Sequence, residues 1–271
     1  MEHEVLIRLG SFLGIFIIMA VWEAVAPRRV LSTSKRIRWV NNLAILSLNP
    51  ISLRLIFPIL PVSLALIAEQ RHWGLLNQVD LSYGIEIITG VFALDFTLYI
   101  QHALFHAFPT LWRLHMVHHT DLDFDVTTGV RFHPIEILLS MGIKLIAVIS
   151  LGPSPLAVLL FEVVLNATSM FNHSNIYLPS EVDRVLRLFV VTPEMHRVHH
   201  SVIIQETNSN FGFSFPWWDR MFGTYRPQPS KGHLDMVIGL AQYREPKHLN
   251  LWQLILMPFT GNPGRVPISR H

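Results

Sequence analysis

Histidine is the residue type most able to do chemistry in this sequence, by number and by spacing. The chain has 15 histidines and no cysteine among 271 residues. Eight of the histidines form one HxxxH and two HxxHH patterns, made by His102 and His106, by His115, His118 and His119, and by His196, His199 and His200. Residues three or four positions apart lie on one face of a helix, so each pattern can converge its imidazoles on one point. Neutral imidazole binds Zn, Cu, Fe or Ni, and the spacing therefore predicts a metal site.

The number of patterned histidines indicates more than one ion. A structural zinc site uses four ligands, whereas these imidazoles suit two ions with roughly three to five nitrogens each. His133 and His173 stand singly and are added as further metal ligands, with a hydrogen-bonding role around the site as the alternative for both. The HExxH pattern of a zinc protease is absent from both triplets. Ligand type alone does not choose the metal, so a zinc-dependent hydrolase or a metal-binding protein without redox chemistry stays open.

Carboxylates near these patterns are candidates to orient the imidazole rings. A carboxylate that accepts a hydrogen bond from one ring nitrogen fixes the other nitrogen toward a metal. The candidates for this role are Asp95, Glu136, Glu194 and Asp219, and plain ion pairs with Arg131, Arg197 or Arg220 are the alternative. Asp95 and Tyr99 share a polar stripe with the HxxxH histidines, and at membrane depth such a stripe must face a cavity or a site. Tyr99 either lines a substrate cavity there or packs.

The elements that position these residues are predicted to be membrane helices. Hydrophobic residues make up 51% of the chain and charged residues 15%, below the roughly 25% of soluble domains. A hydrocarbon core of about 30 Å is crossed by about 20 apolar residues. Apolar stretches lie at 5–26, 51–68 and 83–108, with two shorter ones at 135–150 and 155–171. The shorter two either cross the bilayer as a tight pair or form a re-entrant hairpin.

Two other segments are expected at the membrane interface. Residues 39–48 mix polar and apolar side chains, and their helix is expected to end at Asn49 and Pro50. Residues 249–259 form an apolar helix too short to span the bilayer. The predicted fold is therefore an all-α integral-membrane bundle of about four or five membrane helices, capped by a histidine-rich two-metal region on the cytoplasmic side.

Charge next to the first apolar stretch predicts this orientation. Five basic residues follow it, at Arg28, Arg29, Lys35, Arg36 and Arg38. Cytoplasmic loops are enriched in Lys and Arg, which places the N-terminus outside and residues 109–133 and 172–271 on the cytoplasmic face. The alternative is a cleaved signal peptide that ends at Ala24-Val25-Ala26, but the acidic start of the chain argues against it.

Taken together, the motifs resemble the fatty acid hydroxylase/sterol desaturase superfamily of membrane di-iron oxygenases. The matching text is Asp95-Phe-Thr-Leu-Tyr99-Ile-Gln-His102-Ala-Leu-Phe-His106, Leu111-Trp-Arg-Leu-His115-Met-Val-His118-His119, Arg131-Phe-His133-Pro-Ile-Glu136, Asn172-His-Ser-Asn175, Thr192-Pro-Glu-Met-His196-Arg-Val-His199-His200-Ser201 and Trp218-Asp219-Arg-Met-Phe-Gly223-Thr-Tyr225. The resemblance covers residues 83–226. Ala103 stands where the family's first motif commonly has arginine, a departure that leaves the ligands intact. The stretch 131–136 is similar to the branch that contains alkylglycerol monooxygenase.

The resemblance implies a reaction and a cofactor. Members of this family oxidise an unactivated C–H bond of a lipid with O2, so the chain is expected to be a membrane lipid hydroxylase (monooxygenase). A lipid desaturase on the same site is the near alternative. Two iron ions are implied, with zinc able to replace them in purified protein. The ten histidines named above are the implied ligands. The aromatic run 211–218 is expected to pack as a cover over the site, with an anchor at the membrane interface as the alternative.

The resemblance also implies a protein partner. The sequence contains no GxGxxG nucleotide loop and no cysteine for an iron–sulfur centre, so electrons are expected from a separate electron-donor protein. The residues expected to offer its docking surface are Arg187, Arg197, Arg220 and Arg226. No nucleic-acid partner is expected. Residues 1–271 are expected to form one membrane oxygenase domain, with N-terminal spans in 1–82, the histidine core in 83–226 and a tail in 227–271 that holds the interfacial helix.

Overall fold

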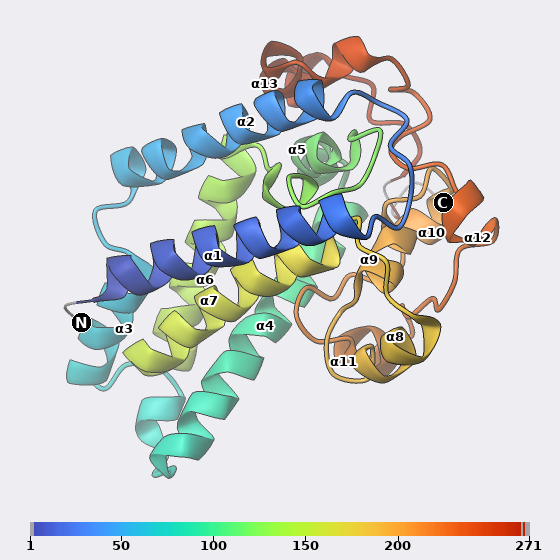
Figure 1. The fold of residues 1–271 in the computed structure, drawn as a ribbon. Coiled ribbons are helices and arrows are strands. Elements are labelled where there is room, and N and C mark those ends of the chain that lie inside the picture. Colours follow the sequence, from blue (N-terminus) through green and yellow to red (C-terminus); the bar gives the residue numbers. More distant parts are fainter. Residues whose placement is uncertain (1–2, 267, 269–271) are drawn as a thin grey trace.

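The computed structural model describes residues 3–266 and 268, and helices make up most of this part of the chain (Figure 1). The α-helices are α1 Glu4–Val25, α2 Lys35–Ile56, α3 Pro61–Gln70, α4 Tyr83–Ala107, α5 Pro109–His119, α6 Pro134–Leu151, α7 Pro155–Asn172, α8 Ser180–Leu186, α9 Pro193–His199, α10 Ile204–Thr207, α11 Trp217–Met221, α12 Gly232–Asp235 and α13 Leu251–Thr260. Short 3₁₀ turns lie at Leu76–Gln78, Thr128–Val130 and Pro246–Leu249. The described residues form no β-strand, only isolated bridges between Pro27 and Ile176 and between Ser201 and Ile238. The all-α prediction is confirmed.

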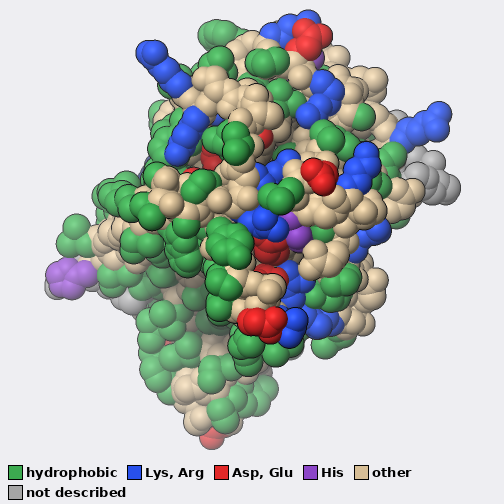
Figure 2. Space-filling model, turned by 45° about the vertical axis from the view of Figure 1, so that its right-hand side comes forward, with side chains coloured by type: hydrophobic (Ala, Val, Ile, Leu, Met, Phe, Trp, Pro, Cys, Tyr) green, Lys and Arg blue, Asp and Glu red, His purple; other side chains and the backbone are tan. Residues whose placement is uncertain are grey.

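In the described residues, five apolar helical stretches are long enough to cross a membrane. They are Glu4–Val25, Lys35–Gln70, Tyr83–Ala107, Pro134–Leu151 and Pro155–Asn172. The shortest have 18 residues, which at 1.5 Å per residue extend over about 27 Å, close to the thickness of a hydrocarbon core. Hydrophobic side chains cover much of the part formed by the long helices, whereas charged side chains gather over the other end (Figure 2). These features indicate a multi-pass membrane protein, as predicted.

Proline begins the helices that surround the histidines. It fixes φ near about −65° and lacks an N–H, and the N–H of the first helical residue has no partner within the helix. Pro109, Pro134, Pro155 and Pro193 occupy the first position of α5, α6, α7 and α9. The hydroxyl of Thr192 then accepts the backbone N–H of Met195 and caps α9. The first residues of α5 and α9, which carry the two HxxHH patterns, are therefore set by proline, and this fixes the position of each histidine along its helix.

The second membrane stretch differs from its prediction. The sequence predicts an interfacial segment that ends at Asn49 and Pro50, followed by a span at 51–68. Instead, α2 continues through Pro50 and ends at Ile56. Helix α3 then begins at Pro61. Packing outweighs the local effect of Pro50, because Asn49 is buried and donates from Nδ2 to the carbonyl of Phe132 at 3.3 Å. The predicted break at Pro50 is wrong.

The long helices pack around the segments that carry the site. Helix α4 packs against α7 and α5, and α1 lies along α7 (Figure 1). One core, formed mainly by α3, α4, α6 and α7, buries Leu94, Val148 and Phe161. Another forms where α5 packs against α2 and α13 around Trp112, whose Nε1–H donates to the carbonyl of Pro263 at 2.8 Å. The C-terminal half of α4 and all of α5 are thereby held from several sides.

A close approach of two glycines joins the turn after α6 to the loop after α3. Gly152 ends α6 with φ at +68°, in the left-handed region. A Cβ at Gly74 would lie 2.3 Å from the backbone nitrogen of Gly152. The backbone N–H of Leu75 donates to the carbonyl of Ser150 at 3.0 Å. A side chain on Gly74 would therefore separate these two segments.

Candidate metal centre

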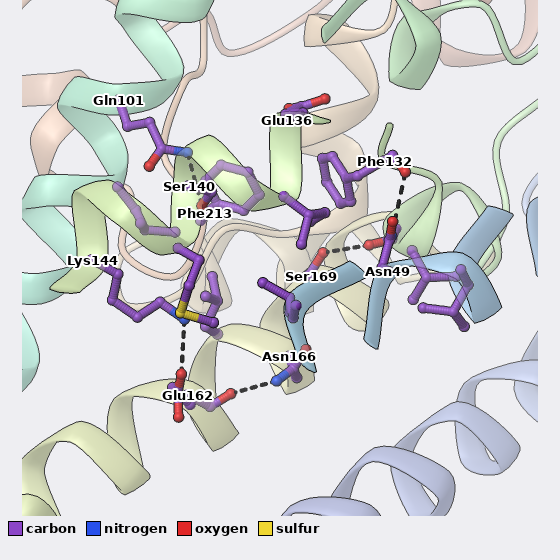
Figure 3. Close-up of a pocket in the computed structure, with 18 of the residues that line it drawn as sticks. Asn49, Gln101, Phe132, Glu136, Ser140, Lys144, Glu162, Asn166, Ser169 and Phe213 are labelled. Atoms are coloured by element: carbon purple, nitrogen blue, oxygen red, sulfur yellow. Dashed lines mark hydrogen bonds and ion pairs between the residues drawn. The ribbon is translucent and has the colours of Figure 1, made fainter. Parts of the chain in front are cut away.

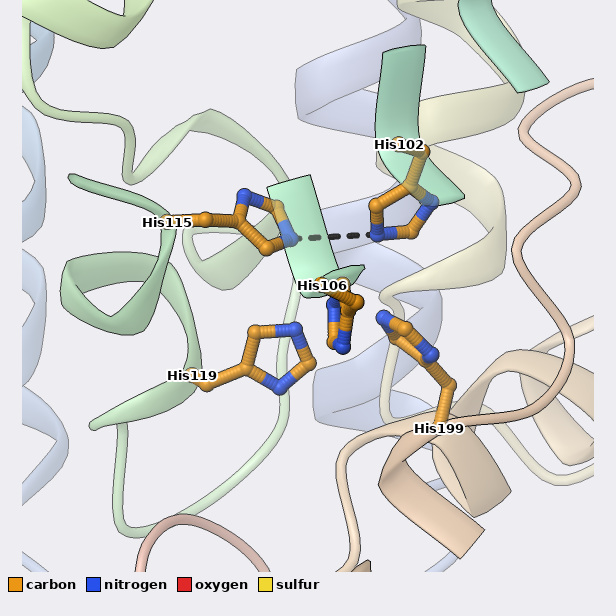
Figure 4. Close-up of side chains that lie close together, drawn as sticks. All are labelled: His102, His106, His115, His119 and His199. Atoms are coloured by element: carbon orange, nitrogen blue, oxygen red, sulfur yellow. Dashed lines mark hydrogen bonds between the residues drawn. The ribbon is translucent and has the colours of Figure 1, made fainter. Parts of the chain in front are cut away.

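Nine of the ten predicted histidines converge in two buried groups. The first group contains His102 and His106 from α4, His115 and His119 from α5, and His199 from α9 (Figure 4). The second group contains His118 from α5, His173 directly after α7, and His196 and His200 from α9 and the residue after it. Within each group, one nitrogen of every ring lies within 4.8 Å of one nitrogen of every other ring. Two compact sets of imidazole nitrogens therefore lie at one end of the bundle.

Each HxxHH triplet is divided between the two groups. In α5, His115 and His119 belong to the first group, whereas His118 belongs to the second. In α9 the assignment is reversed, because only the middle histidine, His199, belongs to the first group. Adjacent helical residues differ by about 100° in direction, so the last two histidines of a triplet diverge. The expectation that each triplet converges on one point is wrong.

Hydrogen bonds at Nδ1 orient the rings of both groups. Three rings donate from Nδ1 to backbone carbonyls at 2.7–2.8 Å, with the pairs His102 to Phe211, His199 to Ser209 and His173 to Ser169. Three others donate from the same nitrogen to Glu136, Asn208 and the carbonyl of Arg131, namely His115, His106 and His118. A neutral ring that carries its proton on Nδ1 keeps a lone pair on Nε2, which here points into the group.

These lone pairs face one another, as metal ligands do. Nε2 of His102 lies 3.0 Å from Nε2 of His115. Nε2 of His173 lies 3.1 Å from Nε2 of His118 and also from Nε2 of His196. Two acceptors at this separation repel unless a cation binds both, and neighbouring ligands of one ion with bonds of about 2.1 Å are about 3 Å apart. The donor set therefore fits metal ions bound through nitrogen.

Other buried nitrogens support the same conclusion. Nε2 of His106, of His119 and of His199 is buried and forms no hydrogen bond within the part of the chain that the structure describes. Buried polar atoms without a partner are uncommon in folded proteins, and a bound ion is one of their recognised explanations. All three belong to the first group.

Burial keeps these imidazoles neutral. It lowers the pKa of His115 and the pKa of His173 to about 3. Burial together with repulsion from neighbouring rings lowers the pKa of His119, of His199 and of His200 well below the usual value of 6.5. A metal binds only the neutral ring, so at neutral pH these side chains are already in the form that binds.

His133 is the predicted ligand that the structure does not bring to the groups. Its Nδ1 accepts the backbone N–H of Ile135 at 3.1 Å, which caps α6. Its Nε2–H donates to the carbonyl of Ile255 at 3.2 Å. His133 stands directly before Pro134, at the N-cap of α6, and this position accounts for the contact of Nδ1. Since Nε2 is also hydrogen-bonded, both ring nitrogens already have partners. The structure corrects this prediction by assigning His133 to helix capping.

Glu136 is the predicted orienting carboxylate that contacts a grouped histidine directly. Its Oε1 accepts the Nδ1–H of His115 at 2.7 Å, and its side chain is buried. Asp95 instead accepts the indole N–H of Trp218 at 2.8 Å. Asp95 therefore positions the aromatic run 211–218 and not an imidazole.

Asp219 acts on a histidine through the backbone. Its carboxylate accepts the backbone N–H of Phe211 at 2.8 Å, and the carbonyl of Phe211 accepts the Nδ1–H of His102 at 2.7 Å. Burial raises the pKa of Asp219 to about 6. The hydroxyls of Tyr99 and Thr224 lie 2.9 Å apart, and Thr224 donates to Asp219 at 2.7 Å. Tyr99 does not line the cavity, and it packs edge-on against Phe211 and supports this chain of contacts.

Glu194 follows the alternative prediction of plain ion pairs. It accepts hydrogen bonds from Arg28 at 2.7 Å and from Arg197 at 2.9 Å. Arg197 is completely buried and Arg187 is 7% exposed, so neither offers the docking surface predicted for a partner. Arg220 is exposed. The predicted docking surface is therefore reduced by two of its four arginines.

A buried ion-pair network holds the loop that follows α5. Arg38 donates from Nε and Nη2 to the two oxygens of Asp121 at 2.6 and 2.8 Å, and it also pairs with Asp125. Arg131 lies next to this network, and its backbone carbonyl accepts the Nδ1–H of His118 at 3.3 Å. Arg38 belongs to the basic cluster that follows the first apolar stretch. Its side chain is completely buried, and Asp121 and Asp125 neutralise its charge inside the protein.

An apolar cavity of about 300 Å³ reaches the first group (Figure 3). His102 and His115 form part of its wall, and the remainder combines apolar and polar side chains, most of them from α1, α2, α4, α6 and α7. Arg8, Lys144 and Glu162 also line it. These three do not belong to any sequence motif. The signal that could identify them is their charge within otherwise apolar helices.

Known proteins are similar to this chain. The fatty acid hydroxylase family model matches residues 87–224. Ornithine lipid hydroxylase OlsE of Rhizobium tropici is 31% identical over 60% of this chain and 50% of its own length. Alkylglycerol monooxygenase of Xenopus tropicalis is 29% identical over 63% of this chain and 37% of its own, and human cholesterol 25-hydroxylase is 30% identical over 49% and 48%. The chain thus spans half the length of these relatives or less, and no solved structure matches it.

The family match coincides with the site. The matched residues make up half of the chain and include every histidine of both groups. They also include Glu136 and Asp219, which hold His115 directly and His102 through the backbone. The chain belongs to the fatty acid hydroxylase family.

Proposed function

We propose that this chain hydroxylates a C–H bond of a membrane lipid with O2, at two iron ions bound by the nine grouped histidines. The observation that carries the proposal is the position of His102 and His115, which belong to the first group and also line the apolar cavity. Such a cavity can hold an alkyl chain against this group and keep water away from it. The hydroxylase and monooxygenase relatives favour a hydroxylated product over a desaturated one.

Several residues have defined tasks in this reaction. Iron, when bound, would supply the activation of O2 and the oxidation of the C–H bond. Glu136 holds the proton on Nδ1 of His115, and the carbonyl of Phe211 holds the proton on Nδ1 of His102. Nε2 of both rings therefore stays free to bind. The ring of Phe213, with its centroid 4.9 Å from that of His102, covers the same imidazole from the cavity side.

We also propose that a separate donor protein supplies the electrons from the cytoplasmic side. Hydroxylation by O2 consumes two electrons besides those of the C–H bond, and a sequence without cysteine offers no iron–sulfur centre to deliver them. The N-terminus then lies outside. Arg29, Lys35 and Arg36 follow α1 and support this orientation through the positive-inside rule. Helix α13 is proposed to lie at the interface, where its exposed Trp252 and Phe259 would meet lipid headgroups.

Lipid extracts from cells that express the chain test this proposal. We expect hydroxylated lipid species with the native chain and none with His119→Ala, and freshly purified native protein should hold roughly two iron ions per chain. A new double bond in place of a hydroxyl would assign the chain to lipid desaturation. Zinc-loaded protein with an unchanged lipid profile would support a non-redox function instead.

A further inference from the structure

Three charged side chains, those of Arg8, Lys144 and Glu162, line one end of the cavity among the membrane helices. Figure 3 shows the contact between Lys144 and Glu162. Glu162 of α7 is 2% exposed and accepts a hydrogen bond from Lys144 of α6 at 2.8 Å. Nη1 of Arg8, on α1, lies 2.6 Å from the other carboxylate oxygen of Glu162. Charged groups at membrane depth are costly, and they are found mainly where they serve a binding site or a pathway.

This cluster lies well away from the histidines. Lys144 follows Glu136 by eight residues on α6, so the two are separated by roughly 12 Å along the helix axis. Glu136 contacts His115. Between them, Ile137 and Met141 line the cavity with apolar side chains. Ser140, which accepts a hydrogen bond from Gln101 at 3.1 Å, adds a polar group to this stretch. The cavity is thus charged at one end, mainly apolar in its middle and bordered by histidine at the other end.

The cluster carries more positive than negative charge. Arg8 and Lys144 provide two cations against the single carboxylate of Glu162. Glu4 also pairs with Arg8 and offsets this excess from outside the cavity, where the side chains of Arg8 and Glu4 are 30% and 21% exposed. Exposed pairs are weakened by solvent, so an anion inside the cavity would still face two cations and one carboxylate.

The cluster also has more hydrogen-bond donors than acceptors. Each oxygen of Glu162 already faces one cation. Lys144 has three N–H donors and uses one on Glu162. Arg8 makes both of its carboxylate contacts through Nη1, so Nε and Nη2 are not engaged by a carboxylate in the described residues. These unused N–H groups require a hydrogen-bond acceptor, and an anionic acceptor would in addition be attracted by both cations.

We propose that Arg8 and Lys144, held in place by Glu162, bind an anionic group of the lipid substrate, a carboxylate or a phosphate, while the attached chain extends along the cavity to His102. This inference rests on the proposed function, because it takes the cavity as the substrate site. Fixing the anion at one end also fixes which part of the chain reaches the histidines. The three residues then determine substrate class, in addition to linking α1, α6 and α7.

Equilibrium binding to the purified full-length chain in an uncharged maltoside detergent tests the proposal. Radiolabelled palmitate is the probe, and hexadecyl phosphate and hexadecanol compete with it, so that carboxylate, phosphate and neutral head groups are compared on one chain length. We expect the favoured anion to bind about tenfold or more tightly than hexadecanol, the scale of one charged hydrogen bond. The ratio between palmitate and hexadecyl phosphate identifies which anion the site takes.

Variants separate binding from a purely structural role. Lys144→Met and Arg8→Met should weaken anion binding about tenfold and leave hexadecanol within about twofold, whereas Lys144→Arg should restore it. Glu162→Gln should strengthen anion binding, because it removes the competing carboxylate. Arg54→Met is the matched control, since Arg54 is an exposed arginine of α2 outside the cavity, and it should change nothing. Thermal midpoints identify any variant that fails to fold, in which case Lys144→Arg and Glu162→Gln decide.

Equal affinity of the native chain for palmitate, hexadecyl phosphate and hexadecanol would overturn the inference, as would charge variants that change all three affinities alike. Binding requires neither O2 nor a reductant, so this result is independent of the reaction. Anion-selective binding without any lipid oxidation would support the inference and count against the proposed function. Lipid hydroxylation that is indifferent to head-group charge would do the reverse.

Discussion

The carboxylate of Glu136 lies 2.7 Å from Nδ1 of His115, and both side chains line the cavity that reaches the first histidine group. Glu136 stands in the first turn of α6, which Pro134 begins and His133 caps. The start of one helix therefore fixes the ring orientation of a histidine on another. Because Glu136 acts through His115, we regard it as a positioning residue for the proposed metal centre.

Substitution of Glu136 should weaken metal binding without unfolding the chain. Glu136→Leu removes the acceptor for the Nδ1–H of His115, and we expect metal affinity to fall about 10- to 100-fold. Glu136→Gln keeps an acceptor oxygen and should lose less. Titration of the metal-free protein with iron(II) or zinc measures both affinities. The control is Glu181→Gln on the exposed surface of α8, and native affinity in Glu136→Leu would contradict the role.

The division of the triplets predicts which double variants lose which ions. His118→Ala combined with His119→Ala damages both groups, so most of the bound metal should be lost. His119→Ala combined with His199→Ala damages only the first group, so about one ion per chain should remain. Elemental analysis of freshly purified protein measures the difference. Loss of both ions from the second double variant would show that the groups do not bind independently.

His133→Ala provides the negative control for that series. The side chain caps α6 and lies outside both groups, so full metal content should be retained. Stability should fall by about 1 kcal/mol through loss of the cap. If His133→Ala lost metal as His119→Ala does, the capping assignment would be incomplete.

The features that the sequence predicts well, namely the membrane helices, the helix starts and the helical faces of the histidines, all depend on short stretches of neighbouring residues. A spacing of four places His102 and His106 on one face of α4, and proline at a first helical position marks the start of α5 and α9. Apolar length identifies the membrane helices, since about 20 such residues cover a bilayer. Each of these features depends on a single helix and not on its neighbours, so the prediction holds in the folded protein.

What the sequence does not reveal depends on how helices pack. The same triplet sends His118 and His119 to different groups, and only the positions of α4, α7 and α9 around α5 decide which. The sequence shows Arg38 only as one of five basic residues after the first apolar stretch, because its partner Asp121 lies 83 residues away and meets it only in the folded chain. Pro50 reads as a helix end, yet α2 continues because packing and neighbouring polar groups outweigh one missing hydrogen bond.

The buried pair of Arg38 and Asp121 should be important for stability. Burial alone would raise the pKa of Asp121, but the adjacent Arg38 guanidinium dominates and holds it well below its usual range. Asp121→Asn removes one of the negative charges that neutralise the buried guanidinium of Arg38. Removal of one partner of a buried ion pair lowers the free energy of unfolding by about 3–5 kcal/mol. The thermal midpoint should fall clearly. Arg184→Met, which breaks an exposed pair with Glu181, should leave the midpoint unchanged.

Asp219 should make stability depend on pH between about 4 and 6. Burial raises its pKa from 3.8 to about 6 in the folded protein, so its favourable contribution is complete below pH 3.8 and is lost as pH rises through 6. Asp219→Asn cannot ionise. Between pH 7.5 and 5, the native chain should therefore gain about 1.4 kcal/mol relative to Asp219→Asn. Parallel pH profiles of the thermal midpoint for the two proteins would rule this out.

The most direct test of the account is the origin of the oxygen in the product. Cells expressing the chain are grown under isotopically labelled O2, and their lipids are compared with those of cells expressing His119→Ala. The account predicts a hydroxylated lipid that carries the label and is absent from the variant. Unlabelled product, whose oxygen came from water, or no oxidised lipid from fully iron-loaded protein with a reductant present, would contradict it.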